Sequence, residues 1–199
     1  MATITAEAVR ELRERTGAGM MDCKRALEEA GGDVDRAIAL LRERGLAAAA
    51  KKAGREAREG LISSYIHTGG RVGVLIEVNC ETDFVARTNE FQELVRLLAI
   101  QVAGLSPRWV DVDGIPADEL DAKRAELARD PTAAAKPAEI REKIVEGQLR
   151  KWFKDVVLLE QPFRDEERSV RELVTERIAT IGENIQVRRF VRYALGEDK

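Results

Sequence analysis

The 199-residue sequence has few of the side chains that build disulfide scaffolds, zinc sites or catalytic centres. Its only cysteines are Cys23 and Cys80, and His67 is its only histidine. The two cysteines stand far apart and lack the short spacing of metal ligands, a sparse usage that is typical of a reducing compartment. The pattern therefore argues against a disulfide framework and against a metal-binding motif.

Aromatic residues and long apolar runs are also scarce. Aromatics make up 5% of the chain, too few for an array of stacking platforms that would bind single-stranded nucleic acid. No apolar run is long enough to cross a bilayer, and the charged, amphipathic segment MATITAEAVRELRERTG is unlike a signal peptide. We expect a soluble cytoplasmic protein with no membrane partner.

An excess of positive charge is missing as well. The formal net charge is −3, although 35% of the residues are charged and 44% are hydrophobic. General binding of nucleic acid needs a basic excess, so the balance argues against that function. A chain of this length holds one medium domain, or a small domain joined to a larger one.

Three short apolar stripes at helical spacing occupy residues 5–45, with glycine-containing breaks at 17–19 and 31–32. Asp33 is placed to cap the third helix. Because helices of this length can share only one small core, the pattern predicts a compact three-helix domain over residues 1–45. The stripe residues are Val9 and Leu12; Met20, Cys23, Leu27 and Ala30; and Val34, Ile38 and Leu41.

Residues 46–59 begin with an alanine run that favours helix and continue with basic residues that form no apolar stripe. We interpret this segment as a solvated, partly helical basic linker. A nucleic-acid-binding tail is the functional alternative.

From residue 60 the apolar period changes to two. Segments 61–67 and 71–79 alternate around Thr68-Gly69-Gly70, which predicts a β-hairpin with Ile62, Ser64 and Ile66 on one face of its first strand. The sequence next predicts helices over 90–104, 116–129, 138–153 and 170–182, with Asn89 placed to cap the first, and a last strand over 183–193. We therefore predict an α+β core over residues 60–199, with a small, largely antiparallel sheet and helices on one face.

Catalytic groups do not assemble in the pattern. His67 lies at a strand end without an obvious serine or cysteine nucleophile. The segment GAGMMD (17–22) lacks the preceding strand and the Lys-Ser/Thr pair of a phosphate-binding loop. Carboxylates are scattered along helix faces, where charge usually indicates solvation. An enzyme stays open, but the residues assemble no catalytic centre, and we expect no cofactor and no metal site.

Two places do not fit a simple core-and-surface pattern. Met20 and Met21 are adjacent on a predicted helix, so one narrow core stripe cannot bury both. Phe84 follows the end of strand alternation and precedes the helical stripe that begins at Phe91. It either fills a local core, as most phenylalanines do, or it is held outward with Asp83 for another molecule.

Two long stretches, LRERTGAGMMDCKRAL (12–27) and VNCETDFVAR (78–87), closely resemble the signature segments of the bacterial elongation factor Ts family. IHTGGRVGVLIEVN (66–79), LLEQPF (158–163) and IGENIQVRRF (181–190) match further family segments in the expected order. The resemblance covers essentially the whole chain. The chain is similar to the short form of the family, which has one core module.

The resemblance implies a nucleotide-exchange factor for the GTPase elongation factor Tu, acting by binding. It implies that the N-terminal domain is a ubiquitin-associated-like bundle that docks on the GTPase. It further implies a homodimer, because the short form offers less contact surface. The segment that enters the GTPase and dislodges Mg²⁺ would be Thr82, Asp83, Phe84 and Val85, and the second contact patch would be Met20 and Met21 with Leu12 and Lys24.

Two other classes of function remain open from the residues alone. An RNA-binding adapter would use the basic groups at 51–58 together with Arg188 and Arg189, and its binding would depend steeply on salt. A hydrolase would combine scattered acids with His67.

Overall fold

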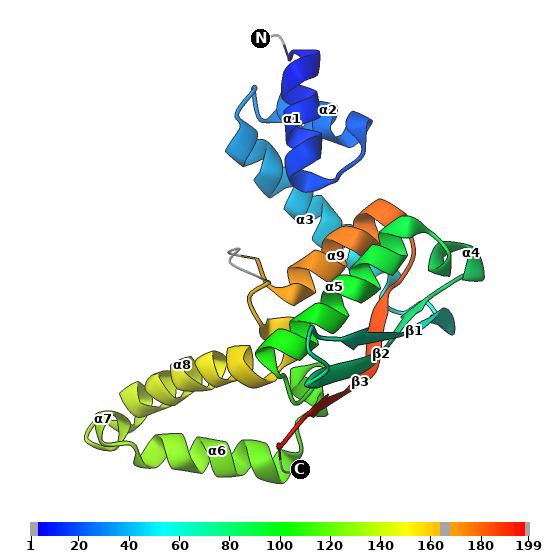
Figure 1. The fold of residues 1–199 in the computed structure, drawn as a ribbon. Helices are drawn as coiled ribbons and strands as arrows, with labels where there is room; N and C mark the ends of the chain where they lie inside the picture. Colours follow the sequence, from blue (N-terminus) through cyan, green and yellow to red (C-terminus); the bar gives the residue numbers. More distant parts are fainter. Residues whose placement is uncertain (1–3, 164–167, 198–199) are drawn as a thin grey trace. The chain divides into compact units, whose positions relative to one another are not determined.

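The computed structural model describes residues 4–163 and 168–197 and has α+β architecture, as the sequence predicts (Figure 1). The chain forms two compact units. The first unit comprises Met1–Ile62, Glu77–Arg96 and Glu172–Val187, and the second comprises Ser63–Ile76, Leu97–Arg171 and Arg188–Lys199. The division cuts through the strands and through helix α5, so each unit contains part of the sheet.

The first unit begins with a three-helix bundle, α1 (Ala6–Thr16), α2 (Met20–Glu29) and α3 (Val34–Lys52). Thr5 and Asp33 cap α1 and α3 through their side-chain oxygens, and Asp33 does so as predicted. The three stripes meet in one small core. Its buried members are Val9, Leu12, Cys23, Ala26, Leu27, Ala30 and Ala37.

Helix α3 continues as one helix through the first half of the segment predicted to be a linker, as far as Lys52. Gly45 is buried where α3 approaches helix α9 (Val170–Ile181), and a methyl group at Gly45 would meet the Ala179 methyl at 3.6 Å. Lys52 Nζ donates to the Ile178 carbonyl oxygen at 3.3 Å. These contacts give Gly45 and Lys52 a role in packing α3 against α9. The domain division at residues 45 and 59 stays a prediction.

Three antiparallel strands, β1 (Glu59–Ile66), β2 (Val72–Cys80) and β3 (Gln186–Ala194), form a sheet in the order β1-β2-β3. The hairpin turn uses Gly69 and Gly70, both with positive φ. Helices pack on one face of the sheet, where alternate β2 side chains are buried from Val74 to Cys80. The opposite face carries exposed apolar side chains, and Ile62 and Ile66 belong to this solvent-facing set.

Helix α5 (Asn89–Leu105) carries the predicted apolar stripe, and all four of its predicted core residues are completely buried: Phe91, Leu94, Leu98 and Val102. The predicted cap was wrong by one residue. Thr88, not Asn89, accepts the Phe91 N–H with its hydroxyl oxygen at 3.3 Å. Two adjacent polar residues with capping side chains are not distinguished by sequence spacing alone.

In the second unit, α6 (Ala117–Arg129), α7 (Pro131–Ala134) and α8 (Ala138–Val156) form a helical hairpin. Asp130 begins α7 by accepting the Thr132 N–H at 2.8 Å. Two short 3-10 turns, η1 (Val112–Gly114) and η2 (Leu158–Glu160), flank the hairpin. The buried Gln161 side chain links α5 to α8: its oxygen accepts from Gln101, and its amide nitrogen donates to the Leu105 and Asp155 carbonyl oxygens.

Within residues 4–163 and 168–197, no helix has both the length and the apolar composition needed to cross a membrane.

Candidate partner-binding site

The TDFV segment, Thr82–Val85, is separated from the end of β2 by Glu81 alone; Thr82 caps the one-turn helix α4 (Asp83–Ala86), which contains the other three residues. Thr82 stays in extended conformation, with φ −129° and ψ 152°, and its hydroxyl oxygen accepts the Val85 N–H at 3.3 Å. A single helical turn of four residues is far below the length that is stable alone, so it depends on contacts outside itself.

Those contacts are made at the base of α4 by Glu183, which lies between α9 and β3 in the first unit. One carboxylate oxygen, Oε2, accepts the backbone N–H groups of Glu81 and Thr82, each at 3.0 Å. The other, Oε1, accepts the Thr82 hydroxyl proton at 2.6 Å. The carboxylate therefore fixes both backbone and side chain at the residue that starts the helix.

Cys80 lies under the same segment, and its side chain is fully buried. Its thiol donates to the Thr82 carbonyl oxygen, with sulfur and oxygen 3.2 Å apart. Burial raises the pKa of Cys80 to about 11, and the nearby negative charge of Glu183 acts in the same direction. The thiol is therefore protonated at neutral pH and serves as a donor, not as a nucleophile.

Phe84 projects into solvent from this anchored turn. Its side chain is 78% exposed, so the interpretation of Phe84 as a local core residue is excluded. Asp83 is half-buried and forms an ion pair with Arg87, with Oδ2 and Nη2 2.7 Å apart. Val85 is half-buried, and Ala86 is the residue of α4 that is buried. The turn thus holds its base inward and displays an aromatic ring beside a carboxylate.

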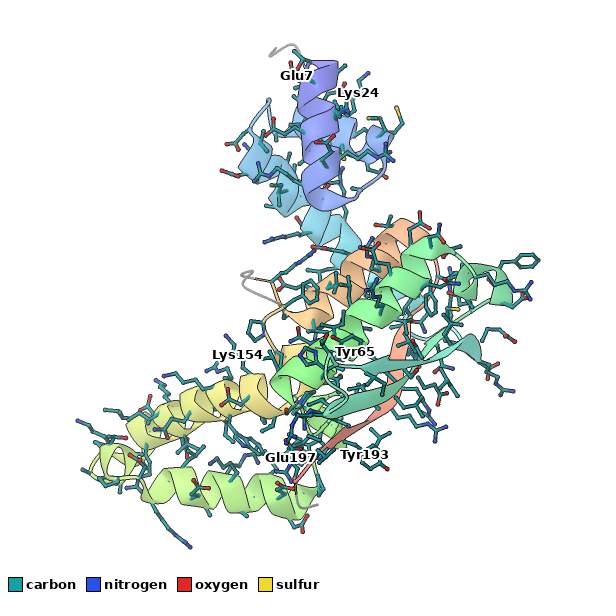
Figure 2. All side chains as sticks on the ribbon, in the orientation of Figure 1. Glu7, Lys24, Tyr65, Lys154, Tyr193 and Glu197 are labelled. Atoms are coloured by element: carbon teal, nitrogen blue, oxygen red, sulfur yellow. The ribbon has the colours of Figure 1, made fainter. Side chains whose placement is uncertain are left out.

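The N-terminal bundle presents the second predicted patch only in part. Met20 and Met21 are 46% and 64% exposed at the start of α2, which confirms that one stripe does not bury both. Lys24, one turn later, is exposed (Figure 2), and its Nζ lies 3.8 Å from Glu28 Oε1. Leu12 is different, because its side chain has no exposed area and belongs to the bundle core.

The remaining polar candidates do not form a reaction centre. His67 is exposed, and its Nδ1 lies 3.0 Å from the Tyr65 hydroxyl. In the described part of the chain, no three His, Cys, Asp or Glu side chains are grouped so that they could hold a metal ion. The TDFV turn and the start of α2 each present exposed apolar side chains beside a single charged residue. Such surfaces provide contact area for a partner.

Comparison with known proteins assigns the family. The sequence model of the family described as Elongation factor TS matches residues 6–197. The chain is 57% identical over 195 residues to the elongation factor Ts of Carboxydothermus hydrogenoformans, covering 98% of this chain and 90% of that relative. It is 58% identical over 200 residues to that of Synechococcus elongatus, with 99% and 90% covered, and 54% identical over 198 residues to that of Desulforamulus reducens, with 99% and 91% covered.

The chain belongs to the elongation factor Ts family.

Elongation factor Ts proteins are nucleotide-exchange factors for elongation factor Tu and are not enzymes in the covalent sense. The family resemblance of the sequence motifs is thereby confirmed. An exchange factor acts through differential binding, so membership of this family requires no nucleophile.

The sequence patterns do not single out Glu183 and Asn184. Both lie in IGENIQVRRF, a segment that the sequence predicts only as the end of a helix and a strand. The available signal was a polar pair between the glycine that ends α9 and the first apolar residue before β3. Polar residues in such a short connection often hydrogen-bond a neighbouring segment, but the sequence does not say which one.

Proposed function

We propose that this chain accelerates GDP release from elongation factor Tu by inserting the TDFV segment into the GTPase and dislodging its Mg²⁺, after which GTP binds. The observation that carries the proposal is the 78% exposure of Phe84 on a turn whose base is fixed by three hydrogen bonds to Glu183. An aromatic ring held in water on a rigid support is available for burial in a partner.

The proposed mechanism follows from how GTPases hold nucleotide. A Mg²⁺ ion and a phosphate-binding loop together neutralise the phosphates of GDP. A protein that moves the groups supporting the ion weakens the binding of GDP to the GTPase without contacting the nucleotide. Linkage requires that GDP weaken the binding of the exchange factor by the same ratio, so this chain binds the nucleotide-free GTPase most tightly.

Phe84 and Asp83 have separate roles in this proposal. Phe84 supplies apolar area that is buried in the complex, and a few such anchors carry most of the affinity of an interface. Asp83, beside it, brings a carboxylate to groups that support the ion. Its present partner, Arg87, is itself exposed, so the pair separates at little cost.

The second contact is the methionine patch, defined as Met20, Met21 and Lys24 at the start of α2. Unbranched methionine side chains adapt to a partner surface, and both are exposed here. Leu12 contributes indirectly, because its burial between the helices holds the bundle in shape.

We also propose that the chain is a cytoplasmic homodimer. The uncovered sheet face in the second unit carries Ile66, Leu75, Tyr193 and Leu195, all exposed, and they line one shallow hollow (Figure 2 labels Tyr193). Contiguous apolar area of this kind indicates an interaction site, and a two-fold dimer uses the same patch from both copies.

The test is dissociation of fluorescent GDP from elongation factor Tu with and without this protein. We expect strong acceleration by the wild-type chain. The Asp83→Ala/Phe84→Ala variant is expected to lose most of it at unchanged thermal stability. Unchanged exchange in this variant would refute the proposed role of the TDFV segment, and so would a loss of exchange that is fully explained by unfolding of the variant.

A further inference from the structure

We propose that Glu183 is a positioning residue for nucleotide exchange: it holds the TDFV segment in the conformation in which Phe84 is displayed. The inference rests on the proposed function of that segment. Glu183 does not itself have to touch the partner, because its effect reaches the partner through Thr82.

The geometry uses both carboxylate oxygens. Oε2 accepts two successive backbone N–H groups, those of Glu81 and Thr82, at 3.0 Å each. Oε1 accepts the Thr82 hydroxyl proton at 2.6 Å, which leaves that hydroxyl oxygen free to accept the Val85 N–H at 3.3 Å. One side chain thus orients the N-cap of α4, and the N-cap in turn orients the helical turn that bears Phe84.

The neighbouring Asn184 makes the reciprocal connection. Its backbone N–H donates to Glu81 Oε1 at 2.6 Å, so residues 81–82 and residues 183–184 exchange carboxylate hydrogen bonds in both directions. The buried Asn184 side chain donates to the Arg55 carbonyl oxygen at 2.7 Å. The base of α4 is therefore also tied to the chain that follows α3.

Gly182 makes this approach possible. It ends α9 with φ 92°, a conformation that side chains other than glycine rarely adopt, and it redirects the chain so that Glu183 follows immediately. Hydrogen bonds to a charged acceptor are stronger than neutral ones, and three of them converge on residues 81 and 82. Loss of Glu183 leaves two N–H groups and a hydroxyl without these acceptors.

The experiment compares Glu183→Ala and Glu183→Gln in GDP release from elongation factor Tu, below the melting temperature of every variant. We expect Glu183→Ala to slow factor-catalysed release about tenfold, the scale of lost charge-assisted hydrogen bonds. Glu183→Gln keeps the shape and one oxygen acceptor, so it should restore part of the rate. Asp130→Ala is the matched control. It removes a carboxylate that caps α7 in the second unit by accepting the Thr132 N–H, and the rate of GDP release should not change.

Two further readouts separate positioning from general destabilisation. Hydrogen exchange at the amides of Glu81, Thr82 and Val85 should accelerate in Glu183→Ala, while the amide of Ile76 within β2 should not. In a double-mutant cycle, Glu183→Ala should add little on a Phe84→Ala background, because the displayed ring is already gone. Thr82→Val should imitate Glu183→Ala because it removes the hydroxyl that donates to Glu183, and Thr82→Ser, which keeps the hydroxyl, should retain more of the rate than Thr82→Val does.

The outcomes distinguish the two proposals. If Phe84→Ala leaves GDP release unchanged, the proposed function of the segment fails. If Phe84→Ala slows release but Glu183→Ala does not, only the positioning role fails. Equal slowing by Glu183→Ala with and without Phe84 would also overturn it, because Glu183 would then act elsewhere.

Discussion

Asp83 and Arg87 form an ion pair across the single turn of α4, with carboxylate oxygen and guanidinium nitrogen 2.7 Å apart. Phe84 lies on the same turn and is the most exposed of the three residues between them. The acid that is proposed to act on the partner is thus already engaged within its own chain. Its partner is 76% exposed, so this engagement is weak and easily exchanged for another.

Replacing Arg87 by glutamine tests this weakness. An exposed ion pair contributes about 0.2–1 kcal/mol, so we expect GDP release to change less than about fivefold. Asp83→Asn, which removes the acid itself, should slow release much more. Stopped-flow measurement of both variants decides the matter, and a larger loss for Arg87→Gln would assign the electrostatic role to the arginine.

Phe84 and Phe91 form a matched pair of aromatic residues with opposite environments. Phe84→Ala should change the free energy of unfolding by no more than about 0.5 kcal/mol, as for other exposed sites, yet weaken binding to nucleotide-free elongation factor Tu by about 2 kcal/mol or more. Phe91→Ala, at a fully buried position, should destabilise the fold by about 3–5 kcal/mol. Chemical denaturation and calorimetric titration measure the two quantities, and similar stability losses would contradict the assignment.

Substitutions in the methionine patch and at Leu12 should affect different properties, partner binding in the first case and stability in the second. Met20→Ala/Met21→Ala is expected to weaken partner binding while leaving the melting temperature nearly unchanged, since both side chains are exposed. Leu12→Ala should destabilise the bundle by about 2–5 kcal/mol, because it opens a cavity in a small core. Full affinity of the double methionine variant would exclude the patch from the interface.

Cys80 predicts a stability change at alkaline pH. Burial raises its pKa in the folded chain from 9.0 to about 11, so the unfolded thiol ionises first as the pH rises. Stability from this group is complete below pH 9 and decreases between pH 9 and about 11. Urea denaturation across this window, compared with Cys80→Ala, should show a decrease that the variant lacks. An equal decrease in both proteins would assign it to other groups.

The sheet face offers a direct test of the dimer. Tyr193→Glu places a charge in the exposed apolar patch and should yield a folded monomer in analytical ultracentrifugation. Ile140→Glu alters an exposed apolar residue on α8 and serves as the control. A dimer that survives Tyr193→Glu would exclude this face, and a wild-type monomer would refute the proposed association.

Local periodic patterns predicted most of the fold. The stripe from Phe91 to Val102 requires only a helical period and apolar side chains, and the hairpin around Gly69 and Gly70 requires only alternation and turn residues. The extension of α3 was only partly foreseen, because its packing depends on Gly45 meeting Ala179, a residue distant in the sequence.

The site was predictable only where its side chains break a pattern. Phe84 belonged to no stripe, and it is exposed. Leu12 did fit the bundle stripe, and the resemblance alone placed it in the contact patch, whereas the structure buries it. Glu183 could not be predicted as an anchor, since nothing in a single sequence pairs a carboxylate with backbone N–H groups 101 and 102 positions earlier.

The distance along the chain between Thr82 and Glu183 has a consequence for synthesis. Translation delivers the TDFV segment to the ribosomal tunnel about a hundred residues before its anchor, since the two are 101 positions apart. A nascent chain therefore carries Phe84 without the Glu183 anchor until Glu183 itself has been translated. Under the proposed positioning role, productive engagement of the GTPase therefore waits until the segment that carries Glu183 has been translated and folded.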